Sequence, residues 1–472
     1  MGGFFGVASK GDCVADLFYG TDYHSHLGTR RGGMVVRGRD GFQRNIHDIT
    51  NAPFRTKFEE DLPKHRGGLG LGVISDYEDQ PLLIGSHHGR YAIVTVGRID
   101  NLQALAEQVL ASRGAHFSEL KGNEVNQTEL VAAIIDREDT LENGIRRVHE
   151  IVDGSCSLLL LTDDALYAAR DRLGRTPVAL GRKDGAYAVT LETCALPNLG
   201  YEVERHLGPG EIVRVTADTV ERLAAPGPHM QICSFLWVYY GYPASSYEGV
   251  NTEVARNRCG AALARRDSVA VDVVAGIPDS GVGHAIGYAT ERGVPYRRPF
   301  VKYTPTWPRS FMPQEQRVRD LVARMKLIPI REIIDGQRLL FCEDSIVRGT
   351  QLRDIITRVF DHGAKEIHMR PACPPLVFGC KYLNFSRSKS ELDLAARKAI
   401  QELEGDANAH LDEYASPSTD RYHRMVEVIR ARIGLTTLAY QQLNDMIEAI
   451  GLAREKLCTF CWTGDDPHPC GR

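Results

Sequence analysis

The chain has 472 residues, of which 43% are hydrophobic and 25% are charged, as in globular proteins. A net charge of −4 provides no basic field for nucleic acid, and apolar runs such as residues 158–161 are far shorter than the ~20 residues that span a membrane. The N-terminus lacks the basic and apolar regions of a signal peptide, so we expect a cytoplasmic protein. The length allows two or three domains.

Residues 1–225 show the pattern of an α+β or layered α/β domain. Runs typical of strands at 82–85, 92–96, 157–161 and 186–191 alternate with glycine-rich turns, and apolar residues recur at helical spacing over 102–111 and 128–135. The run GGLGLG at 67–72 is followed by no convincing helix, so we expect no dinucleotide-binding loop there.

The second half opens at Cys233 with an aromatic-rich segment, followed by an amphipathic helix over 251–266. Residues 269–296 then have the pattern of an apolar strand, a loop with the sequence PDSGVG, and a helix. Residues 338–360 repeat this order, with a buried parallel strand, a polar loop and a helix. Two such units in tandem predict an open parallel sheet whose ligand lies beyond the carboxyl ends of the strands.

The polar loop of the second unit, EDSIVRGT, carries the most specific chemistry. Its small and hydroxyl residues at a helix N-terminus direct backbone N–H groups and the positive end of the helix dipole toward one point, which suits a phosphate. Glu343 and Asp344 cannot help to hold phosphate, but they can hold sugar hydroxyls or a Mg²⁺ ion. This combination predicts a ribose 5-phosphate that carries a diphosphate.

EDSIVRGT resembles the thirteen-residue motif of type I phosphoribosyltransferases, in a form close to that of the glutamine phosphoribosylpyrophosphate amidotransferases, and PDSG resembles the diphosphate loop of that family. The resemblance implies that Glu343 and Asp344 are catalytic, and that they form a Mg²⁺ site with Ser280. The substrate-binding residues that it implies are Asp279, Ser280, Gly281, Lys302, Arg309, Lys326, Ser345, Ile346, Val347, Arg348, Gly349 and Thr350.

Residues 302–312, KYTPTWPRSFM, align with the family loop that closes over the substrate. Lys302, Arg309 and Phe311 match this loop in kind, whereas Pro305 and Pro308 replace an Arg-Tyr pair. Because proline fixes φ, we expect a stiffer loop here than in the family.

Residues 166–196 and 206–215 resemble the second half of the family's glutaminase domain. Such domains are N-terminal nucleophile hydrolases, with two antiparallel sheets between helix layers and an N-terminal cysteine as the nucleophile. In this chain Gly2 stands at the nucleophile position, and Ser75 at the arginine that binds the glutamine carboxylate. The oxyanion-hole segment aligns with VGRI at 96–99, which includes Arg98, and Gln127 replaces the aspartate that receives the substrate ammonium. Four losses in one pocket imply a glutaminase domain that has kept its fold and lost its activity.

Eleven cysteines are too few over this length for a secreted disulfide framework, so we expect buried thiols or metal ligands. The CxxC at Cys458 and Cys461 alone is ambiguous among zinc, iron–sulfur and redox roles. The resemblance implies the iron–sulfur branch of the family, with a 4Fe-4S cluster held by Cys233, Cys380, Cys458 and Cys461 as a structural clamp. Zinc and plain thiols are the alternatives.

Residues 405–430 have no evident counterpart in the family and show helical character. They are interpreted as a surface insertion, or alternatively as an element that docks a partner.

The predicted fold is α/β, with a degenerate amidotransferase domain over 1–230 as an αββα sandwich, and a parallel-sheet transferase domain with C-terminal helices over 231–472. The resemblance implies an enzyme that transfers an amine to phosphoribosylpyrophosphate and releases diphosphate, which in the family is the first step of purine synthesis. We expect free or partner-supplied ammonia as the amine source, because glutamine-handling positions are missing. The alternatives are a different nucleophile, or a regulator that binds phosphoribosylpyrophosphate without catalysis. We also expect a homo-oligomer.

Overall fold

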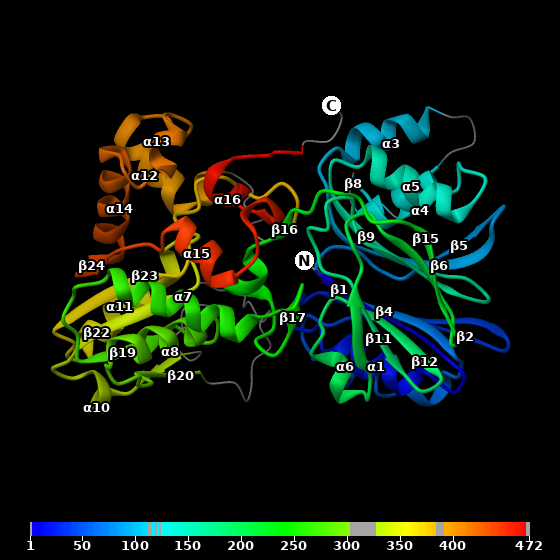
Figure 1. The fold of residues 1–472 in the computed structure, drawn as a ribbon, viewed down its shortest axis with the longest axis horizontal. Helices are drawn as coiled ribbons and strands as arrows, with labels where there is room; N and C mark the ends of the chain where they lie inside the picture. The colour runs from blue at the N-terminus through cyan, green and yellow to red at the C-terminus, as the bar shows by residue number, and fades with distance from the viewer. Residues whose placement is uncertain are drawn as a thin grey trace.

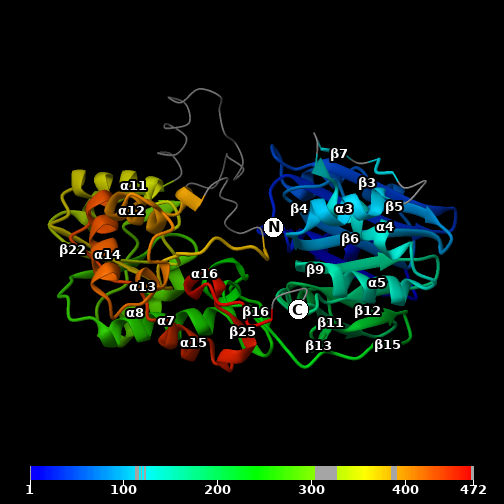
Figure 2. The same ribbon diagram turned by 90° about the horizontal axis from the view of Figure 1, so that it is seen from above.

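The computed structural model describes residues 2–111, 116–118, 120–121, 124–302, 327–383 and 391–468. These residues form two units that lie side by side (Figure 1, Figure 2). The first unit contains two large sheets, and the second is built on a four-stranded sheet. Among the described residues, no helix combines the length and the apolar character needed to cross a bilayer.

The sheets of the first unit have the strand orders β13-β11-β12-β1-β4-β2-β3 and β15-β14-β10-β9-β6-β5, with antiparallel neighbours. The first sheet comprises β1 (Gly2–Ser9), β2 (Arg31–Gly38), β3 (Gly41–Asp48), β4 (Leu69–Ser75), β11 (Ala179–Lys183), β12 (Ala186–Thr190) and β13 (Glu202–His206). The second comprises β5 (Leu82–Ser86), β6 (Gly89–Ile99), β9 (Gly154–Leu161), β10 (Leu166–Ala169), β14 (Ile212–Val215) and β15 (Val220–Ala224).

Alternation of side chains along the strands explains the layers of this unit. In β1, Phe4 packs between the two sheets, whereas the next residue, Phe5, packs against outer helices. In β9, Leu159 packs between the two sheets, whereas its neighbour Leu158 packs against the helices on the other side of the unit. The outer helices are α1 (Val14–Asp22), α2 (Phe54–Phe58) and α6 (Ala195–Asn198) on one side, and α3 (Leu102–Leu110), α4 (Gln127–Ile135) and α5 (Leu141–Ile151) on the other. The predicted αββα sandwich is therefore confirmed.

The second unit contains a parallel sheet of order β19-β22-β23-β24, formed by β19 (Val273–Gly276), β22 (Arg338–Glu343), β23 (Glu366–Pro371) and β24 (Thr437–Leu438). Leu340 packs on one face against α7 (Thr252–Arg266) and α8 (Gly281–Arg292). Leu339 and Phe341 pack on the other face against α11 (Thr350–Asp361), α12 (Ala395–Glu404) and α14 (Asp420–Ile433). A parallel sheet with C-terminal helices was predicted for this unit, and the structure confirms it.

The segment 405–430 is part of this core. It contains α13 (Leu411–Ala415) and most of α14, whose side chains Tyr414 and Met425 are fully buried in the same cluster as the strands. The interpretation as a surface insertion was wrong, because one face of each helix completes the packing over the sheet.

Short elements connect the unit to its C-terminal segment. The two-residue strands β16 (Ile232–Cys233) and β25 (Leu457–Cys458) pair in parallel, which joins the start of the second unit to the end of the described chain. This unit also contains η2 (Leu236–Tyr240), β20 (Phe300–Lys302), α15 (Leu443–Ile450) and α16 (Phe460–Thr463).

Candidate active site and cysteine centre

The loops with the predicted phosphate-binding sequences lie next to each other. β19 and β22 are adjacent parallel strands in which Gly276 pairs with Cys342, so the loops that follow them leave the same edge of the sheet. Gly281 is required at their crossing, because a Cβ atom there would lie 2.4 Å from the carbonyl oxygen of Cys342. Gly349, with φ +74°, allows the second loop to turn into α11.

Asp344 links the two loops. Its side chain is 5% exposed and accepts hydrogen bonds from the hydroxyls of Ser280, at 2.5 Å, and Ser345, at 2.6 Å. Burial and the adjacent Asp344 carboxylate raise the pKa of Glu343 well above its usual value. Two neighbouring acids with hydroxyls around them are a favourable environment for a divalent cation and for sugar hydroxyls.

The other predicted substrate-binding residues occupy several kinds of position. Lys302, the last residue of β20, forms an ion pair with Asp279 in the first loop. Arg348 is exposed and lies 3.5 Å from Asp393. Ile346 is buried in the core, and the carbonyl of Val347 accepts a hydrogen bond from Ala395 N, so these two contribute to loop shape.

Thr350 is the first residue of α11. Arg309, Lys326 and the loop after Lys302 that was predicted to be stiffer lie outside the described residues.

The four predicted ligand cysteines converge from distant parts of the chain. Cys233 and Cys458 are partners in the β16–β25 ladder, and Cys461 lies one turn later in α16. Cys380 and Cys461 share a hydrogen bond, which is the main cause that lowers the pKa of the Cys380 thiol to about 7. Electrostatic interactions also connect the Cys461 thiol with those of Cys233 and Cys458.

The chemistry of this donor set suits a metal or an iron–sulfur cluster. The four thiols come from three segments of the chain and are buried or half-buried, and thiolates are the usual protein ligands of such clusters. Across the described residues, no group of three or more cysteine, histidine or acidic side chains is already arranged to hold a metal ion.

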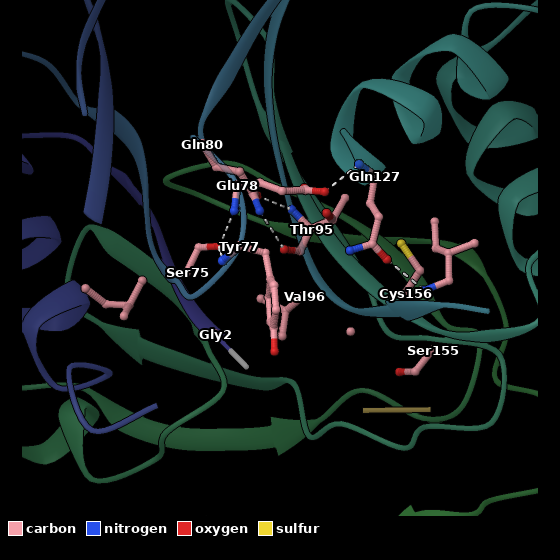
Figure 3. Close-up of a pocket in the computed structure, with 13 residues that line it drawn as sticks. Gly2, Ser75, Tyr77, Glu78, Gln80, Thr95, Val96, Gln127, Ser155 and Cys156 are labelled. Atoms are coloured by element: carbon pink, nitrogen blue, oxygen red, sulfur yellow. Dashed lines mark hydrogen bonds between the residues drawn. The ribbon is translucent and has the colours of Figure 1, made fainter. Parts of the chain in front are cut away.

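The first unit contains a small pocket at the positions predicted to have lost glutamine chemistry (Figure 3). Gly2, Ser75 and Gln127 all line the pocket, as does part of the segment 96–99, although they come from β1, β4, β6 and α4. The space that water-sized molecules can occupy is about 30 Å³, enough for roughly two waters. A Cβ atom on Gly2 would lie 2.3 Å from the carbonyl oxygen of Ile74.

The backbone N–H groups that line this pocket already donate hydrogen bonds to side chains of the protein. The carboxylate of Glu78 accepts hydrogen bonds from the Gln127 and Thr128 backbone N–H groups at the N-terminus of α4, at 2.5 and 3.3 Å, and from the Thr128 hydroxyl at 3.0 Å. Burial raises the pKa of Glu78. The side-chain carbonyl of Gln127 accepts a hydrogen bond from Ile99 N at 2.8 Å.

Three further residues that the sequence analysis did not assign to these roles belong to the two centres. Glu78 fills the pocket, and Arg175 donates a hydrogen bond to the sulfur of Cys458 at 3.2 Å. The guanidinium of Arg98 donates to the carbonyl of Cys380 at 3.2 Å, a role different from that of the oxyanion hole, which the sequence analysis predicted to be lost. No local pattern indicates these contacts, because each joins segments that are far apart in the sequence.

Comparisons with known proteins agree on one family. Residues 70–198 match the model of a glutamine amidotransferase domain. The chain is 30% identical to the amidophosphoribosyltransferase of Methanocaldococcus jannaschii, over 99% of this chain and 98% of the relative, and 29% identical to that of Bacillus subtilis, over 98% and 94%. Its structure resembles the B. subtilis glutamine phosphoribosylpyrophosphate amidotransferase complexed with ADP and GMP, with a TM-score of 0.84, 28% identity, and coverage of 98% and 97%.

Proposed function

The chain belongs to the amidophosphoribosyltransferase family, and on this premise we propose that it transfers the nitrogen of ammonia, and not of glutamine, to phosphoribosylpyrophosphate. The observation that carries the proposal is the contrast between two sites. A hydrogen bond between Ser280 and Asp344 joins the two described loops of the transferase site, whereas the family nucleophile position is Gly2, where the backbone has no room for a side chain.

In the transferase step, the lone pair of ammonia attacks the anomeric carbon, the bond to the diphosphate oxygen breaks, and the diphosphate leaves with the electron pair. The added nitrogen then loses a proton to solvent. Glu343 and Asp344 hold the ribose hydroxyls and stabilise the positive charge that develops on the sugar. The backbone N–H groups of residues 345–350 hold the 5-phosphate.

Ser280, Glu343 and Asp344 would hold a Mg²⁺ ion, since their oxygen atoms are the ligands that this ion prefers. When bound, Mg²⁺ supplies positive charge to the leaving diphosphate. Lys302 adds a second positive charge beside the first loop.

The pocket in the first unit supports the loss of glutaminase activity. The carboxylate of Glu78 accepts hydrogen bonds from the N–H groups at the start of α4, and the side-chain carbonyl of Gln127 accepts one from the N–H of Ile99. A free glutamine would have to displace both side chains and would still meet no thiol at Gly2. The remaining space of about 30 Å³ accommodates roughly two water molecules, which occupy less room than a glutamine.

We also propose that the four converging cysteines hold a 4Fe-4S cluster, which would join β16, the segment around Cys380 and the C-terminal α16. Its function in this proposal is structural.

The test measures diphosphate release by the purified, cluster-containing enzyme from phosphoribosylpyrophosphate and Mg²⁺, with either ammonium chloride or glutamine. We expect turnover with ammonium, which increases with pH because only unprotonated ammonia has a lone pair, and none with glutamine. Glutamine-dependent turnover would refute the proposal. Diphosphate release with another amine but not with ammonia would indicate a different nucleophile.

A further inference from the structure

The first unit extends one loop into the cysteine centre of the second. The loop follows β10 and is fixed by the buried carboxylate of Asp171, which accepts hydrogen bonds from Arg175 N at 3.0 Å and from Thr176 N at 3.1 Å. Ser157 from the neighbouring β9 donates to the same carboxylate. A loop held by this number of bonds presents Arg175 in one defined position.

Arg175 contacts both partners of the β16–β25 ladder. Its backbone carbonyl accepts a hydrogen bond from Cys233 N at 3.1 Å, and its Nη1 donates to the sulfur of Cys458 at 3.2 Å. The guanidinium carbon lies 3.3 Å from the ring centre of Tyr382, two residues after Cys380. One residue of the first unit therefore contacts the surroundings of three of the four cysteines, Cys233 through its backbone and the other two through its side chain.

The guanidinium of Arg175 is buried and forms no hydrogen bond to a carboxylate of the described residues. The residue is 2% exposed, and its nearest carboxylate, on Asp466, is 3.7 Å away, beyond hydrogen-bonding distance. Within the described part of the chain, Arg175 Nε is buried without a hydrogen-bond partner. A buried guanidinium in this state needs an anion nearby, and thiolates bound to an iron–sulfur cluster supply negative charge at the sulfur that Arg175 already contacts.

We propose that Arg175 is a positioning residue for the cluster, which holds the Cys458 corner and sets the electronic properties of the bound metal. This inference rests on the proposed cluster. A hydrogen bond from a cation to a ligand sulfur withdraws electron density and stabilises the reduced cluster, so it raises the reduction potential. In this view the first unit has a second role, independent of glutamine, as one wall of the cluster site.

Arg98 provides a matched control. It also comes from the first unit and reaches the same centre, but its contact there is with the carbonyl oxygen of Cys380, and among the described residues it donates to no sulfur. Removing its charge should therefore leave the cluster potential close to that of the wild type, although both substitutions remove one arginine from the interface.

The experiment uses the full chain purified without oxygen. Iron and sulfide are quantified first, and the cluster is then titrated with a chemical reductant while its spectrum is recorded. We expect Arg175→Gln to shift the midpoint potential to a more negative value and to lose iron to a chelator several-fold faster. Arg175→Lys, which keeps the charge without the fork of donors, should lie between, and Arg98→Gln should match the wild type in potential.

The outcomes separate the two proposals. Wild-type protein without iron and sulfide would overturn the cluster itself. A wild-type cluster whose potential is unchanged in Arg175→Gln would overturn the role of Arg175 alone. If Arg175→Gln holds no cluster, the midpoint potential of Arg175→Lys is the test of the role of Arg175. A wild-type potential in Arg175→Lys would overturn that role, and a shifted potential would support it.

Discussion

The hydroxyl of Ser280 donates a hydrogen bond to the carboxylate of Asp344, across two loops that follow adjacent parallel strands. This contact connects the two sequence motifs that most strongly indicate phosphoribosyl chemistry. It also makes Asp344 the residue through which the arrangement of both loops can be tested.

Asp344→Asn should abolish most diphosphate release while leaving the fold intact. The amide has a similar shape to the carboxylate, but it cannot neutralise positive charge on the sugar or hold Mg²⁺ equally well, so we expect a loss of about 10²-fold or more in kcat. Initial rates with saturating ammonium measure the effect. Asp361→Asn, at the exposed far end of α11, is the control, and equal losses in both variants would contradict the assignment.

Cys461→Ser should remove most of the iron bound to the purified protein. Serine cannot replace a thiolate ligand well, and the remaining three cysteines would leave one iron without protein ligation. Iron and sulfide analysis measures the loss. Cys259 is buried and its sulfur donates to the carbonyl of Ala372, so Cys259→Ala should retain the metal. Unchanged iron in Cys461→Ser would argue against the cluster.

Gly2→Cys should not restore glutaminase activity, and it should destabilise the first unit. The new Cβ would lie 2.3 Å from a backbone oxygen of β4. The strands must shift to remove this clash, which lowers the free energy of unfolding by about 1–3 kcal/mol. Urea unfolding measures the cost. Gly85→Cys is the matched control in another strand, since a Cβ there meets no atom within 4 Å. Glutamine hydrolysis by Gly2→Cys would show that β1 and β4 adjust more easily than the structure implies.

Stability should fall as the pH decreases from about 6.5 toward 4. Burial lowers the pKa of His24 to about 4 and that of His284 to about 3, from 6.5 in the unfolded chain. Below pH 6.5 the unfolded state therefore binds protons that the folded state does not, which reduces the free energy of unfolding by up to about 1.4 kcal/mol per pH unit for each histidine. The loss is complete only below the folded pKa values.

Urea titrations across this pH range measure the slope. His24→Gln should reduce it, and the exposed His87→Gln should not. An unchanged slope in His24→Gln would show that other groups cause the acid sensitivity.

Local patterns predicted much of the fold. The strand and the helix expected within 338–360 correspond to β22 and α11, and the patterns at 102–111 and 128–135 correspond to α3 and α4. These predictions succeeded because periodicity is a short-range property. The proximity of Ser280 and Asp344 was also predictable, since adjacent parallel strands place their following loops together.

The missed features depend on long-range register. Met425 recurs at helical spacing with the apolar residues of α14, which indicates an amphipathic helix, but the surface that this face covers follows only from how α14 packs over the sheet. Likewise, Glu78 and Arg175 are charged residues whose partners, at the start of α4 and at Cys458, come close only in the assembled units. Buried charges are rare, and the sequence alone does not indicate where their counterparts lie.

The parallel pairing of β16 with β25 sets a condition on biosynthesis. Residues 232 and 233 leave the ribosome long before their ladder partners, residues 457 and 458, have been made. β16 and its Cys233 therefore remain unpaired during synthesis until translation has passed α16. Any delivery of iron to the four cysteines would follow release of that segment, so cells that halt synthesis early would accumulate chains without this centre.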